Sequence, residues 1–136
     1  MFKKILLVLI TALILGACNQ KDAEPTTAIT LEEVITSISD QGLTLEEVDL
    51  PENNAFIQDL NGVSPTFYSL KGTPLSIYIF QTVNDRKEGI EEFEKSTETG
   101  ELERFNTFTI KNVLIFYVEG EKVTNKKLTS AVSELN

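Results

Sequence analysis

The chain has 136 residues, with 12 basic and 21 acidic side chains and a net charge of −9. This acidity argues against nucleic acid and anionic lipid headgroups as partners, because both would be repelled. The chain has no histidine and one cysteine. Mechanisms that need imidazole, and metal sites built on histidine or on several cysteines, are therefore excluded.

The N-terminus has the three parts of a secretory signal peptide. Lys3 and Lys4 are followed by an apolar stretch over residues 5–15, and small residues then precede Cys18. The apolar stretch is shorter than the roughly 20 residues that a membrane span needs. The pattern predicts export of the downstream chain.

The sequence Leu-Gly-Ala-Cys at residues 15–18 resembles the bacterial lipobox. The resemblance implies a diacylglyceryl group on the Cys18 sulfur, cleavage between Ala17 and Cys18, and possible acylation of the new amine. Two or more acyl chains give stable anchoring. The alternative is an uncleaved short anchor helix with an incidental cysteine.

Three regions are therefore expected. Residues 1–17 are a signal peptide, residues 18–28 are the lipidated Cys18 with a flexible tether, and residues 29–136 are a single domain. Removal of residues 1–17 leaves 119 residues and a charge of about −11. That length suits one domain with a single modest core and no disulfide.

The domain begins with a predicted helix. Thr30 and Glu33 have the spacing of a capping box, apolar residues repeat on one helical face over residues 31–41, and Gly42 supplies a stop. Residues 43–48 then read as a weak strand.

The middle of the chain predicts short strands and turns. Residues 55–60 are a short apolar stretch. Pro65 indicates that the strand at 66–70 lies at a sheet edge or starts late. Alternation at 75–80 predicts a further strand. Turns are predicted at residues 61–62 and 71–74.

The last part of the chain predicts two helices around a hairpin. Asn84 is the expected cap of a helix over 85–97. Strands follow at 105–110 and 113–118, and the second is apolar on both faces, as a central strand would be. A final helix is predicted at 125–135. The fold class is α+β, with a mainly antiparallel sheet and about three helices packed on it.

No catalytic, cofactor-binding or metal-binding residue is predicted. The sequence lacks a nucleophile with a base, a glycine-rich phosphate loop and a calcium loop. Glu91, Glu92 and Glu94 form the densest acidic cluster, but such a run is usually a solvated helix face. Carboxylates that act alone, as in a glycan hydrolase, would have to converge in a cleft.

Aromatic residues in the predicted strands are the other candidate surface. An exposed aromatic strip would bind a partner or an apolar ligand, whereas helices on the second face of the sheet would bury it. The strand aromatics are Phe67, Tyr68, Tyr78, Phe80, Phe105, Phe108, Phe116 and Tyr117.

Residues 60–63, 75–80, 84–93 and 111–118 resemble a group of small uncharacterised lipoproteins of Bacillus and relatives. The resemblance implies a Gram-positive surface protein and transfers no catalytic residue. We expect a non-enzymatic interaction or accessory domain on the extracytoplasmic face of the cell membrane, held there by its lipid, with an envelope protein as a possible partner. The alternatives are a small-ligand or cation-binding lipoprotein and, third, a carboxylate-only hydrolase.

Overall fold

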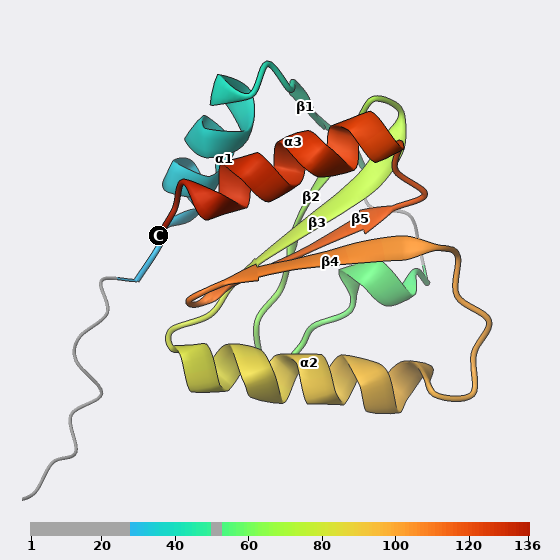
Figure 1. Ribbon diagram of the computed structural model, residues 1–136. Helices are drawn as coiled ribbons and strands as arrows, with labels where there is room; N and C mark the ends of the chain where they lie inside the picture. The colour runs from blue at the N-terminus through green and yellow to red at the C-terminus, as the bar shows by residue number, and fades with distance from the viewer. Residues whose placement is uncertain (1–27, 50–52) are drawn as a thin grey trace, which may run out of the picture.

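The computed structural model of the chain describes residues 28–49 and 53–136. A five-stranded antiparallel sheet in the order β1-β2-β3-β5-β4 lies between two helices on one face and one on the other (Figure 1). The α+β prediction is confirmed. The helices are α1 (Leu31–Asp40), α2 (Val83–Thr97) and α3 (Lys122–Ser133). The strands are β1 (Leu45–Glu47), β2 (Thr66–Leu70), β3 (Thr73–Ile79), β4 (Phe105–Ile110) and β5 (Val113–Val118).

Helix α1 begins with the predicted capping box. The backbone N–H of Glu33 donates to Thr30 Oγ1 at 3.3 Å, and the backbone N–H of Thr30 donates to Glu33 Oε2 at 2.7 Å. The helix ends at Asp40, and Gly42 follows with φ 75°. A residue without Cβ adopts this conformation at little cost, so both predicted boundary signals are confirmed.

Helix α2 begins two residues earlier than predicted. Thr82 is its N-cap, and its hydroxyl accepts a hydrogen bond from the Asp85 backbone N–H at 3.0 Å. The prediction of Asn84 as the cap is wrong, because Asn84 lies within the first turn and its amide donates to Glu88 at 3.1 Å. Threonine and asparagine are both good caps, so the sequence did not distinguish them.

Helix α3 also begins early, at Lys122 rather than Asn125. Its N-cap, Glu121, makes no side-chain capping hydrogen bond. The sequence therefore contains no usual capping residue at the point where α3 begins, and the helix start could not be predicted from one.

Strand β2 begins at Thr66, directly after Pro65, and is an interior strand. Of the two alternatives predicted for it, an edge position or a late start, the edge position is therefore wrong. The strand pairs with β3 along its length, while β1 pairs only with residues 68–70. Pro65 lies just before the strand, and its missing N–H therefore removes no hydrogen bond from the β2–β3 ladder. The β2–β3 turn has positive φ at both Lys71 and Gly72, the geometry that matches the twist of a hairpin.

All six residues of β5 are buried, and the strand lies between β3 and β4. Its prediction as an interior strand covered on both faces is confirmed, although β3 is the middle strand of the five. Alternate β5 residues serve two cores. Val113, Ile115 and Tyr117 pack toward α1 and α3, and Leu114, Phe116 and Val118 pack toward α2.

Candidate functional site

The predicted lipidation site lies outside the described residues. Cys18, the cleavage point after Ala17, and the tether up to residue 27 all precede Ala28, the first residue that the structure describes. Within residues 28–49 and 53–136, every helix is too short or too polar to cross a bilayer.

The predicted acidic cluster does not form a shared site. Glu91, Glu92 and Glu94 are exposed on α2, and Glu92 Oε2 accepts a hydrogen bond of 2.6 Å from the backbone N–H of Asn61. Among the described residues, no group of three or more acidic or cysteine side chains is arranged to hold a metal ion. The Glu92 carboxylate instead ties α2 to the predicted turn at Asn61, where the Leu60–Val63 bridge closes.

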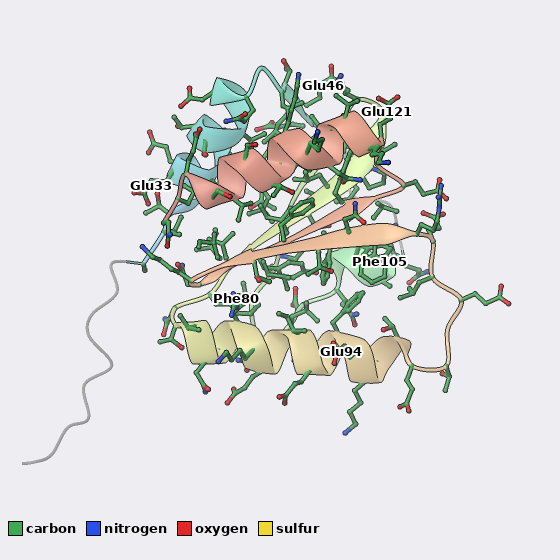
Figure 2. The ribbon with its side chains drawn as sticks, viewed as in Figure 1. Glu33, Glu46, Phe80, Glu94, Phe105 and Glu121 are labelled. Carbon is green, nitrogen blue, oxygen red and sulfur yellow. The ribbon has the colours of Figure 1, made fainter. Side chains whose placement is uncertain are left out.

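Most strand aromatics are buried, as expected if helices cover both sheet faces. Phe80 and Phe105 lie between the sheet and α2 (Figure 2). There they join a cluster in which the Phe93 and Phe116 ring centroids lie 4.4 Å apart. Six of the eight strand aromatics are buried, and the two half-buried ones, Phe105 and Phe108, both belong to β4. Exposed aromatic surface is thus confined to one strand rather than spread over a face.

Two open grooves lie near the start of the domain. One, of about 570 Å³, separates α1 from the end of α3 and carries the carboxylates of Glu32, Asp40 and Glu134. The other, of about 560 Å³, lies beside Leu31 and is lined by Ile77 and Ile79. No carboxylate among the described residues is buried, so neither groove offers the desolvated acid that general acid catalysis uses.

A third groove, of about 540 Å³, runs between α3 and strand β4. None of its side chains is charged, although the chain as a whole is strongly acidic. Its lining combines three apolar side chains with four hydroxyl-bearing ones and one amide. The lining residues are Thr107, Phe108, Thr109, Ile110, Thr129, Val132, Ser133 and Asn136.

Among the strands that the structure describes, β4 is an edge strand and pairs on one side only, with β5. The Glu119 N–H donates to the Arg104 carbonyl at 2.7 Å, which extends the β4–β5 ladder by one pair. Inward-facing and outward-facing backbone groups alternate along an antiparallel strand. The residues whose N–H and C=O groups face away from β5 are therefore Phe105, Thr107 and Thr109.

The two sheet edges differ in their protection against further pairing. Edge strand β1 has only three residues, two of which are the exposed Glu46 and Glu47. Short edges and charged side chains discourage strand addition. The six residues of β4 include no charge and no proline, and its register with β5 continues without a bulge. Within residues 28–49 and 53–136, the outer edge of β4 therefore pairs with no further strand and lacks both of these protections.

The chain matches no family model, no curated protein and no solved structure. The groove at β4 was not among the sites predicted from sequence. One sequence feature could have indicated this surface, because a predicted strand without any charged residue is unusual in so acidic a chain. That strand is Phe-Asn-Thr-Phe-Thr-Ile, at residues 105–110. Its significance depends on the strand order, which the sequence did not provide.

Proposed function

We propose that the protein is a lipoprotein of the extracytoplasmic face of the cell membrane in a Gram-positive bacterium, and that its domain is a non-enzymatic interaction module. The observation that carries the proposal is the Leu-Gly-Ala-Cys sequence ending at Cys18, directly after a charged and then apolar N-terminus. Acyl chains on Cys18 would hold the chain to the membrane.

The start of the domain fits a short tether. The backbone of Ile29 is held in the domain by Asn112, whose Oδ1 accepts from the Ile29 N–H at 2.8 Å. Ten residues lie between Cys18 and Ile29, and the eleven steps along the chain span at most roughly 40 Å when extended. A lipid on Cys18 would keep the domain within that distance of the bilayer.

The polar groups inside the domain support a non-enzymatic role. The buried polar side chains among the described residues are those of Ser37, Ser76, Asn112 and Thr124. Ser37 Oγ donates to the Ala131 carbonyl at 2.6 Å, and Ser76 Oγ donates to the Phe56 carbonyl at 2.5 Å. These hydroxyls hold neighbouring segments together, and neither faces a base that would activate it for attack.

The anchor is tested by expressing the full chain and its Cys18→Ala variant in a Gram-positive host. We expect the unchanged chain to be cut after Ala17, to carry the added mass of a diacylglyceryl group and to sediment with membranes. Cys18→Ala should lose both the added mass and the cleavage. Asn19→Ala is the matched control and should behave as the unchanged chain. Equal mass shifts in all three proteins would exclude lipidation at Cys18.

A second candidate function is the binding of a small apolar ligand. The observation that favours it is the groove beside Leu31, Ile77 and Ile79, whose volume of about 560 Å³ is in the range of small-molecule sites. A ligand of the folded state raises the unfolding temperature. Thermal unfolding against a panel of fatty acids, other metabolites and divalent metals tests this function, and the absence of any shift rejects it.

A further inference from the structure

We propose that Asn61 is a site of spontaneous covalent modification, at which the side-chain amide is converted to a carboxylate, and that helix α2 controls the rate of this reaction. The inference goes beyond the proposed function and does not depend on it, because it rests on the chemistry of one turn and on the contacts of that turn with α2.

The sequence of the turn supplies the chemistry. Asn61 is the one asparagine of the chain that glycine follows. In such a pair the backbone nitrogen of the second residue can attack the side-chain amide carbon of the first, and glycine has no Cβ to hinder the attack. Both residues are exposed, and a Cβ placed on Gly62 would have no atom beyond its chain neighbours within 4 Å. The surroundings therefore leave room for a ring to form between the two residues.

The reaction consumes only water. The Gly62 nitrogen forms a bond to Cγ of Asn61, the Cγ–Nδ2 bond breaks, and Nδ2 leaves as ammonia with the proton that the Gly62 nitrogen gives up. Water then opens the resulting cyclic imide at one of its two carbonyl carbons. One product is aspartate at position 61. The other is isoaspartate, in which the backbone runs through the former side chain and is longer by one carbon.

Three hydrogen bonds with α2 restrain Asn61. Its N–H donates to Glu92 Oε2 at 2.6 Å, and its Nδ2 donates to the Asp85 carbonyl at 3.1 Å and to Glu88 Oε2 at 3.3 Å. The side-chain amide is therefore directed toward α2. Ring closure requires this amide to turn to the Gly62 nitrogen instead, so the reaction proceeds from the minor population in which the contact with α2 is open.

The backbone of the turn leads to the same requirement. Asn61 and Gly62 have φ of 47° and 75°, and hydrogen bonds of 2.9 Å join Leu60 and Val63 in both directions. This is the compact two-residue turn that an Asn-Gly pair favours. The Gly62 N–H lies between these two hydrogen bonds and takes part in neither. It becomes the nucleophile when the turn opens.

The product weakens the contact that controls the reaction. A carboxylate at position 61 has no N–H to donate to α2, and it adds a negative charge beside Glu88 and Glu92. Isoaspartate also lengthens the turn next to Leu60, a fully buried residue whose Cβ lies 3.5 Å from the position of a Cβ on Gly89. Conversion of Asn61 therefore loosens α2 at this edge of the core.

The test is incubation of the full chain, purified in detergent, at pH 8, with peptide mapping by mass spectrometry to follow each asparagine. Glu92→Ala removes the acceptor of the Asn61 N–H. Glu91→Ala is the matched control, because it removes the same charge from an exposed neighbouring position of the helix. Asn106 and Asn125 are internal references, since threonine and lysine follow them.

We expect Asn61 to convert before the two reference asparagines. Glu92→Ala should speed this conversion by about fivefold, the population change expected from one lost hydrogen bond. Glu91→Ala should remain within about twofold of the unchanged chain. The converted protein carries one more negative charge and can be separated by ion exchange. Hydrogen exchange at its Gly89 and Phe93 amides should be faster than in the unconverted protein.

Three results would overturn the proposal. The first is conversion of Asn106 or Asn125 at the same rate as Asn61. The second is no greater acceleration in Glu92→Ala than in Glu91→Ala, because the contact with α2 would then not control the reaction. The third is unchanged hydrogen exchange in α2 of the converted protein. None of these measurements depends on acylation, so their outcome is distinguishable from that of the Cys18→Ala experiment.

Discussion

Gly89 of α2 lies directly against the ring of Phe80, the residue that follows β3. A Cβ atom placed on Gly89 would lie 2.7 Å from both Cε1 and Cζ of Phe80. The ring itself stacks on Tyr78, with centroids 6.1 Å apart and planes 14° apart. The close approach of α2 to the aromatic core therefore depends on the missing side chain at position 89.

Gly89→Ala should destabilise the protein, although alanine is normally the better helix former by about 1 kcal/mol. Overpacking against Phe80 should lower the free energy of unfolding by about 1–3 kcal/mol in chemical denaturation. Gly100→Ala is the control, because its nearest atom to a new Cβ is 3.8 Å away. A more stable Gly89→Ala variant would show that α2 can move away from the ring at little cost.

Asn112 joins three parts of the fold through one buried amide. Its Nδ2 donates to the carbonyls of Ile29 and Phe80, both at 2.9 Å, and its Oδ1 accepts from the Ile29 N–H. Asn112→Ala should lower the free energy of unfolding by about 2–4 kcal/mol, since several buried backbone groups lose their partners. It should also speed hydrogen exchange at Ile29.

Asn112→Asp separates the contributions of that amide, because it keeps the acceptor for Ile29 and loses both donors. We expect its stability to lie closer to that of Asn112→Ala than to that of the unchanged chain. The exposed Asn106 of β4 provides the control, and Asn106→Ala should change the free energy by no more than about 0.5 kcal/mol. Equal stability of all variants would contradict the assigned role of Asn112.

Tyr78 should make stability fall at alkaline pH. Its hydroxyl donates to the Gln58 carbonyl at 2.8 Å and lies 3.2 Å from that of Phe56. Burial, with a smaller contribution from Asp59, raises the pKa of Tyr78 well above its ordinary value. The folded state thus favours the neutral phenol. The resulting contribution to the free energy of unfolding is fully present below about pH 10, the pKa of tyrosine in the unfolded state. It is lost as the pH rises from there toward the higher pKa of the folded state.

Denaturation at pH 8 and pH 10.5 measures this effect. Tyr78→Phe should be less stable than the unchanged chain at pH 8 by about 1 kcal/mol, because the hydrogen bonds are lost. It should also lose less stability between the two pH values. The same loss in both proteins would assign the alkaline effect to other groups.

Glu33 should make the folded state less stable as the pH falls into the acidic range. Hydrogen bonds from the Thr30 backbone N–H and hydroxyl lower the pKa of Glu33. A lowered pKa stabilises the folded state above the ordinary carboxyl pKa, and that stabilisation disappears as pH falls through the folded value. Glu33→Gln keeps an acceptor oxygen and removes the titration.

Unfolding temperatures between pH 7 and pH 2.5 test this linkage. The unchanged chain and Glu32→Gln, which alters an exposed neighbour in the same turn, should lose more stability on acidification than Glu33→Gln. A steeper acid loss in Glu33→Gln than in Glu32→Gln would contradict the prediction.

The hydrophobic runs and turn residues predicted most of the fold, because they act locally. The Thr30 cap, the turn at Lys71 and Gly72, and the β5 strand follow from neighbouring residues alone. The interior position of β2 does not, since it depends on β1 pairing from the opposite side. The packing role of Gly89 was equally hidden, because its partner Phe80 lies outside α2, just after β3.

The candidate site was only partly predictable for the same reason. The aromatic residues of the strands left two alternatives open, an exposed strip or burial under helices, and six of the eight are buried. The two that remain half-buried, Phe105 and Phe108, belong to β4. That β4 is an edge strand follows from the insertion of β5 between β3 and β4. No local pattern in Phe105–Ile110 encodes that arrangement.

The pairing of β3 with β5 has a consequence for the order of folding. Each hairpin, β2–β3 and β4–β5, closes across only two residues, as at Lys71 and Gly72. The β3–β5 ladder instead joins Ile79 to Val113 and so must close a loop that contains the whole of α2. Loop closure costs more entropy as the loop lengthens. The two hairpins can therefore form early and separately, and their docking along β3 and β5 is the step that we expect to set the folding rate.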